Sequence, residues 1–257
     1  MNIVRELIQY REFLKSNVKK EIRGKYKGSF LGMLWSFLNP LLSVVVYAII
    51  FPYIMRMQME HYLIYLITGI IPWTFFTMSI NSGMISILVN ANIIKKVYFP
   101  RIILPIASVT SALVNFLISC LIILAFVIFS GIGLSFNLLY LPLVVIIQYI
   151  LLLGITFVLS AIDLYFRDIE NIMIFFINML FYATPILYTP DIFPEKISFI
   201  INLNPMAHLI NAYRDIFYYK TTPDLLSLGL VGLVSIVILL VGYLIFDRLQ
   251  KGFAEEV

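Results

Sequence analysis

The chain has 257 residues, of which 61% are hydrophobic and only 12% are charged, and its mean hydropathy is +0.99. About a quarter of the residues in a soluble domain are charged, so this composition excludes an ordinary soluble protein. The net charge of +4 comes largely from one stretch near the N-terminus. Attraction to anionic lipid headgroups explains that stretch without a nucleic-acid partner.

The basic stretch covers residues 1–27 and carries eight Lys or Arg residues. Its apolar residues recur at three- and four-residue steps, at Ile3, Leu7, Tyr10, Leu14, Val18 and Ile22. This spacing places them on one side of a helix, with basic side chains on the other side. The pattern predicts an amphipathic helix that lies in the membrane interface.

The rest of the chain contains five charge-free runs of at least 20 residues, the length that a helix needs to cross a bilayer. The longest run is split by the turn-forming residues 131–137, GIGLSFN. Strands are disfavoured, because these segments are apolar on every face. The sequence therefore predicts an all-α membrane protein, a single domain over 1–257, with six transmembrane helices at about 30–51, 62–89, 103–130, 138–162, 171–187 and 225–246.

The segment 188–224 is too polar for a seventh span. Its charge-free part, 197–213, is short and is interrupted by Asn202, Asn204 and His208. Non-helical backbone is tolerated at membrane depth only where protein or a cavity surrounds it. We therefore expect short re-entrant or interfacial helices between the fifth and sixth spans.

The basic residues set the orientation of these spans. With six spans, fourteen Lys or Arg residues lie on the side of the N-terminus and four lie on the other side, namely Arg56, Lys196, Arg214 and Lys220. Because cytoplasmic loops are enriched in basic residues, both termini are expected in the cytoplasm.

Catalytic signatures are missing from the sequence. It contains no GxxxxGK[ST] phosphate-binding loop, no HExxH and no GxSxG motif. Its single cysteine, Cys120, excludes a disulfide framework. The predicted spans carry no charged residue except near their ends, which disfavours a proton-coupled carrier. We expect a transport protein that is not an enzyme and that binds no metal.

Aromatic residues gather in the outer halves of several spans. Tyr47 and Phe51 are four residues apart and share a helix face, while Tyr182 and Tyr188 lie in and at the end of the fifth span. One interpretation is the aromatic belt of a membrane interface. The other is a channel lining, because aromatic rings stack on sugar rings and Tyr hydroxyls form hydrogen bonds with them.

Several motifs resemble those of one transporter family, in the same order along the chain. They are IRGKYKGSFLGMLWSFLNPLL at 22–42, KKVYFPR at 95–101, LP at 104–105, DLYFRD at 163–168, TPILY at 184–188, NP at 204–205 and AYRD at 212–215. Together they resemble the permeases of type-2 ABC exporters for cell-surface polysaccharides, such as O-antigen and teichoic acid.

The resemblance implies a homodimer of six-span subunits in the bacterial cytoplasmic (inner) membrane. Two separate ABC subunits would bind ATP and magnesium, so this chain would hold no cofactor. The substrate would be an undecaprenyl-diphosphate-linked glycan. The two short cytoplasmic loops, 92–101 and 165–170, would contact the ATPase through Lys95, Lys96, Tyr98, Arg101, Arg167 and Asp168. For the second loop, a local salt-bridged helix end is the alternative.

Three alternatives stay open at this point. The first is a teichoic acid exporter in place of an O-antigen exporter. The second is an ABC exporter of drugs or small lipids, which would share the fold and differ in its channel lining. The third is a membrane-embedded glycosyl- or acyltransferase, which would need a carboxylate or histidine as a base in a membrane cavity.

Overall fold

The computed structural model describes residues 3–25, 28, 30–55, 59–189 and 201–253. Within these residues the chain is helical and contains no strand. The helices, in order, are α1 (Ile3–Gln9), α2 (Arg11–Lys25), η1 (Gly32–Leu34), α3 (Trp35–Met55), α4 (Tyr62–Met84), α5 (Ser86–Val89), α6 (Ala91–Ile94), α7 (Ile103–Phe129), η2 (Phe136–Tyr140), α8 (Leu141–Asp163), α9 (Asp168–Ala183), α11 (Pro205–Arg214), η4 (Asp215–Tyr219), α12 (Leu225–Leu249) and η5 (Gln250–Gly252).

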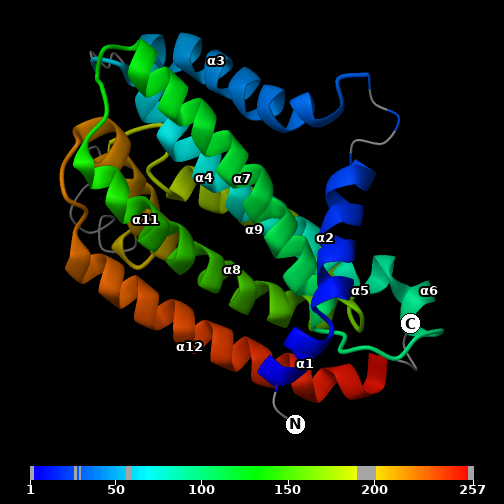
Figure 1. The fold of residues 1–257 in the computed structure, drawn as a ribbon. Coiled ribbons are helices and arrows are strands. Elements are labelled where there is room, and N and C mark those ends of the chain that lie inside the picture. Colours follow the sequence, from blue (N-terminus) through cyan, green and yellow to red (C-terminus); the bar gives the residue numbers. More distant parts are fainter. Residues whose placement is uncertain (1–2, 26–27, 29, 56–58, 190–200, 254–257) are drawn as a thin grey trace.

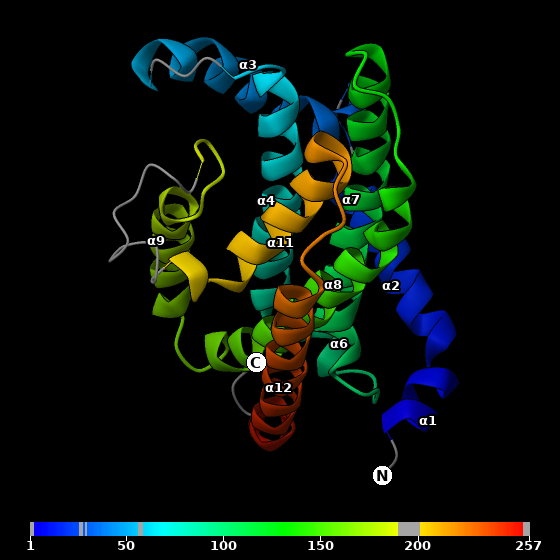
Figure 2. The same ribbon diagram turned by 90° about the vertical axis from the view of Figure 1, so that its left-hand side faces the viewer.

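Four long helices, α4, α7, α8 and α12, run in broadly the same direction and form the body of the molecule (Figure 1). α4 is central, because it packs against α3, α7 and α8, and most of its residues are buried. α12 packs mainly against α8 and leaves most of its surface exposed. In Figure 2, α3 and α9 lie on one side of α4, whereas α7 and α2 lie on the other side.

These four helices match four of the six expected spans. Tyr62–Met84, Ile103–Phe129, Phe136–Asp163 and Leu225–Gly252 are long and apolar enough to cross a membrane. The apolar part of α3 is shorter, Leu38–Phe51. α9 has 16 residues, which at 1.5 Å per residue extend about 24 Å. The all-α class is confirmed, and the count of six spans stays a prediction.

The helices α3 and α9 are shifted from the expected ranges 30–51 and 171–187, and two other expected helices are each divided into two. The second expected span, 62–89, is two helices, because α4 ends at Met84 and α5 begins at Ser86. The expected N-terminal helix is also divided, into α1 and α2. The turn predicted between the third and fourth spans is present, and Gly131 and Gly133 adopt positive φ angles of 80° and 77° there, which glycine tolerates without steric cost.

The two ends of the helical body differ in charge. One end carries α1, α2, the loops that follow α6 and α8, and the end of α12, and we call it the basic end. Its described cations include Arg5, Arg11, Lys15, Lys95, Lys96, Arg167, Arg248 and Lys251. The opposite end carries the α3–α4 and α7–α8 connections and the segment with α11 and η4 (Figure 1). Of the expected outer segment 188–224, residues 190–200 lie outside the described part.

Candidate functional site

The loop between α6 and α7 is anchored at one residue and exposed at its neighbours. The ring of Phe99 is buried and lies 4.7 Å from the ring of Phe13 on α2. Lys95, Lys96 and Tyr98 are exposed on the surface. The loop therefore presents two cations and an aromatic ring at the basic end, while Phe99 holds its backbone in place.

Arg101 has a different environment from the other residues of this loop. Its guanidinium donates a hydrogen bond to the carbonyl of Gln250, at the end of α12, and lies 5.9 Å from the centre of the Phe253 ring. It also lines a cleft of about 740 Å³ between α1, this loop and the end of α12. Arg101 thus joins the loop to α12, whereas Tyr98 and the lysines remain free to contact another protein.

The second loop, between α8 and α9, is joined to the same helix end. The hydroxyl of Tyr165 donates a hydrogen bond of 2.9 Å to the carbonyl of Leu249. Arg167 and Asp168 are exposed, and Asp168 lies in the first turn of α9, where the helix dipole stabilises an acidic residue. Both predicted contact loops are therefore fastened to the backbone where α12 ends, one at the carbonyl of Leu249 and the other at the carbonyl of the next residue, Gln250.

At the opposite end, aromatic rings from three helices form one cluster. Tyr47 on α3 lies 5.7 Å from Phe51 and 6.1 Å from Phe181 on α9, measured between ring centres. Phe181 also lies 5.8 Å from Trp73 on α4 and 5.3 Å from Tyr182. We call these five residues the aromatic cluster. The structure thus brings together three of the four predicted channel residues, with Phe181 and Trp73 joining them.

The fourth predicted channel residue, Tyr188, lies apart from the open surface. Tyr182 has 65% of its surface exposed, whereas Tyr188 has 8%. The hydroxyl of Tyr188 donates to the carbonyl of Tyr182, and its own carbonyl accepts a hydrogen bond of 2.8 Å from the Tyr65 hydroxyl. Tyr188 therefore fixes the turn that follows α9 against α4.

Arg214 is a buried residue whose position the sequence analysis did not identify. It has 1% of its surface exposed, and its two terminal nitrogens donate to the carbonyls of Pro185 and Ile186 at 2.6 and 2.7 Å. The guanidinium carbon lies 3.6 Å from the centre of the Tyr65 ring, a close cation–π contact. Arg214 thereby ties α11 to α4 and to the turn after α9.

A second buried polar group lies next to this one and was also missed. The side chain of Gln148 on α8 donates to the carbonyl of Pro72 at 3.0 Å and accepts a hydrogen bond from the Tyr213 hydroxyl at 2.8 Å. The AYRD motif marked Tyr213 and Arg214 as unusual, but Gln148 stands alone in an apolar run. No signal in the sequence indicated its partner.

In the described ranges, the structure brings together no group of three or more His, Cys, Asp or Glu side chains that could hold a metal ion. The candidate functional surfaces described above are therefore the basic end with its two loops and the aromatic cluster at the opposite end.

Comparisons with known proteins agree on one family. The model of the ABC-2 type transporter family matches residues 12–218. The chain is 38% identical over 237 residues to the O-antigen export system permease protein RfbA of Klebsiella pneumoniae, covering 92% of this chain and 91% of that protein. It is 35% identical to RfbA of Myxococcus xanthus over the full length of both chains. The polysialic acid transport protein KpsM of Escherichia coli is 24% identical over 241 residues.

Proposed function

The chain belongs to the ABC-2 type transporter family, and we propose that it is the channel-forming subunit of an ATP-driven exporter of lipid-linked polysaccharide. The observation that carries this proposal is the identity of 35–38% to O-antigen export permeases over nearly the whole chain. Transport of a teichoic acid, or of a drug or small lipid, is the alternative that the same fold permits.

We further propose that α3 and α9 complete a set of six spans, with both termini in the cytoplasm of a bacterium. Both helices expose long apolar side chains, such as Val45 and Ile49 on α3 and Phe175 and Met179 on α9. They lie on the same side of α4 (Figure 2). A second copy of this chain on that side would enclose a channel between the subunits and cover these faces, which supports a homodimer.

Two separate ATP-binding subunits, with ATP and magnesium, would dock at the basic end. Lys95, Lys96 and Tyr98 are exposed there, and complementary charge speeds and orients such an encounter. Movement of either loop would pull on α12, because Tyr165 bonds to the carbonyl of its last residue, Leu249, and Arg101 bonds to the carbonyl of the next residue, Gln250. This arrangement offers a route by which ATP binding moves the membrane helices.

We predict that cysteines at Tyr98 and Arg167 form crosslinks to the ATPase. The background is low, because the chain's single native cysteine, Cys120, is buried. A cysteine at Phe136, an exposed residue at the opposite end, is the matched control. Yields at Tyr98 and Arg167 of roughly tenfold over this control are expected. Equal yields at all three positions would mean that the orientation or the partner is wrong.

The aromatic cluster would guide the sugar chain. Each ring contributes about 0.5–1.5 kcal/mol by stacking, which is strong enough to replace water and weak enough to let a polymer advance. The undecaprenyl-diphosphate-linked glycan is therefore the proposed substrate. A drug exporter would not depend on these rings for the display of glycan at the cell surface.

Surface display of the glycan tests this function. In cells that lack the gene, the unmodified chain should restore display, and Tyr47→Ala, Phe51→Ala and Tyr182→Ala should lower it roughly two- to tenfold per folded complex. Tyr188→Ala should lower both folded protein and export, since its ring fixes the turn at the rim of the cluster. The control is Phe129→Ala, which removes an exposed ring from the last residue of α7, at the same end of the molecule as the aromatic cluster. Normal display by all four variants would assign these rings to the lipid boundary.

A further inference from the structure

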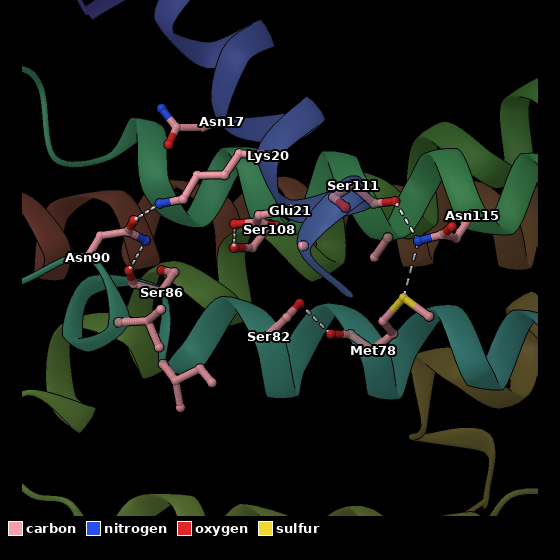
Figure 3. Close-up of a pocket in the computed structure, with 14 residues that line it drawn as sticks. Asn17, Lys20, Glu21, Met78, Ser82, Ser86, Asn90, Ser108, Ser111 and Asn115 are labelled. Atoms are coloured by element: carbon pink, nitrogen blue, oxygen red, sulfur yellow. Dashed lines mark hydrogen bonds between the residues drawn. The ribbon is translucent and has the colours of Figure 1, made fainter. Parts of the chain in front are cut away.

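A pocket of about 440 Å³ lies at the basic end between α2, the α4–α5 junction and α7 (Figure 3). It is separate from the two loops and from the aromatic cluster. α2 lies across α4 from α9 (Figure 2), so the pocket faces away from the side that a second copy would cover. The proposed function assigns no role to it.

Two opposite charges stand next to each other on the α2 wall of this pocket. The ammonium group of Lys20 donates to the side-chain oxygen of Asn90 at 3.0 Å. One carboxylate oxygen of Glu21 accepts a hydrogen bond of 2.6 Å from the Ser108 hydroxyl. Neither charge forms an ion pair with any residue that the structure describes. The pocket therefore offers a cation and an anion that are held by neutral groups.

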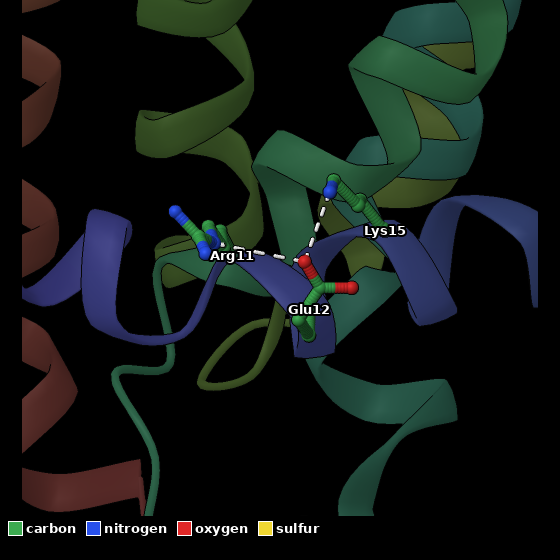
Figure 4. Close-up of polar contacts among 3 residues, drawn as sticks. All are labelled: Arg11, Glu12 and Lys15. Atoms are coloured by element: carbon green, nitrogen blue, oxygen red, sulfur yellow. Dashed lines mark hydrogen bonds and ion pairs between the residues drawn. The ribbon is translucent and has the colours of Figure 1, made fainter.

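A second pair on the same helix shows the usual arrangement for comparison. Glu12 lies on the exposed surface of α2 and pairs with Lys15 at 2.9 Å and with Arg11 at 3.6 Å (Figure 4). Glu21 forms no ion pair with a described residue, although its side chain is less exposed than that of Glu12. Burial raises the pKa of the Glu21 carboxyl, while the hydrogen bond from Ser108 and the charge of Lys20 lower it.

Buried polar atoms without partners also line the pocket. Ser86 and Asn115 have 3% of their surface exposed, and the hydroxyl of Ser86 and the side-chain oxygen of Asn115 form no hydrogen bond to any described residue. Buried polar groups are nearly always paired with protein or with an ordered ligand or water. The side-chain amide of Asn90 donates a hydrogen bond to the backbone carbonyl of Ser86. The unpaired hydroxyl of Ser86 therefore lies close to Lys20, which is bonded to the same Asn90 (Figure 3).

Most of the remaining wall is apolar, although Asn17, Ser82 and Ser111 also line it. Met78, Ile85, Val89 and Ala112 contribute to it. The pocket extends along α7 from Ser108 to Asn115, which is about 10 Å at 1.5 Å per residue. A long, partly apolar pocket with both charges at one end suits an amphipathic molecule better than a small ion. In the orientation proposed above, its place beside an amphipathic helix at the basic end corresponds to the inner leaflet.

We propose that this pocket binds a phospholipid of the inner leaflet whose headgroup carries both a phosphate and a primary amine. The phosphate would meet Lys20 and the Ser86 hydroxyl, and the amine would donate to Glu21. The upper part of an acyl chain would follow the apolar wall, and a water would serve Asn115 at the far end. A lipid diphosphate fits less well, because Glu21 would repel its additional negative charge.

The test is native mass spectrometry of the purified transporter with equal amounts of phosphatidylethanolamine, phosphatidylcholine and phosphatidylglycerol. The choline headgroup keeps the phosphate but has no N–H donor, and the glycerol headgroup lacks the amine. We expect the ethanolamine lipid to be retained about tenfold better than the choline lipid, as one charge-assisted hydrogen bond predicts. Equal retention of these two lipids, or a preference for the glycerol lipid, would overturn the proposal.

Two variants separate the roles of the charges. Glu21→Gln should bring the ratio of ethanolamine to choline lipid close to one, whereas Lys20→Gln should lower the retention of both lipids and keep the ratio. Glu12→Gln, on the exposed surface of the same helix, is the matched control and should change neither. A ratio that Glu21→Gln leaves at its original value would overturn the assignment. Soluble phosphoethanolamine distinguishes a lipid from a free headgroup as the ligand. If it competes with the lipid, the headgroup alone suffices for binding, and if it does not compete, the acyl chain is needed.

Discussion

The substitution Gly154→Leu is expected to separate α8 from α12 and to remove most of the folded protein. A Cβ atom on Gly154 would lie 2.6 Å from the backbone nitrogen of Leu239 and 2.7 Å from the carbonyl carbon of Ile238. These are backbone atoms, which cannot move aside without moving the helix. Gly242 faces Gly154 from α12 in the same way, and small residues of this kind let two membrane helices approach closely.

The expected cost is about 3 kcal/mol or more, because overpacking costs roughly 1–3 kcal/mol even where side chains can adjust. Gel filtration and the thermal midpoint of the purified chain are the measurements. Gly229→Leu is the control, since nothing lies within 4 Å of a Cβ atom at that position of α12. Normal yield and thermal midpoint for Gly154→Leu would contradict the close contact of these helices.

The second large effect is expected for Arg214→Met. This change keeps much of the side-chain volume but removes both donors from the carbonyls of Pro185 and Ile186. A buried acceptor left without a partner costs about 1–3 kcal/mol, so the two together should cost about 3 kcal/mol or more. Arg214→Lys should recover only part of this, because an ammonium group lacks the planar fork that reaches two carbonyls.

The thermal midpoint and limited proteolysis of the outer segment measure this effect, and glycan display reports its consequence for transport. Arg248→Met, an exposed residue near the end of α12, is the control. If Arg214→Met is as stable as Arg248→Met, the turn after α9 is held by other contacts, such as the hydrogen bonds from Tyr62 and Tyr65 to the carbonyls of Leu187 and Tyr188.

The sequence by itself determined the class of the protein, because that class depends on local quantities. Apolar runs of about 20 residues are typical of membrane helices, and α4, α7, α8 and α12 follow from four of them. The turn at Gly131 follows from residue type in the same way. The shorter helices α3 and α9 show the limit of this argument, since a run of apolar residues does not fix where a helix begins and ends.

Only the tertiary structure decided which polar and aromatic residues meet. Arg214 counted as one more cation of an outer loop until α11 was seen to bury it against Tyr65. Lys20 and Glu21 read as ordinary members of a basic helix, and their neutral partners, Asn90 and Ser108, lie 70 and 87 residues further along the chain. Composition and periodicity report which face of a helix is apolar. They do not report which other helix lies against it, and the partners of a buried polar group depend on that choice.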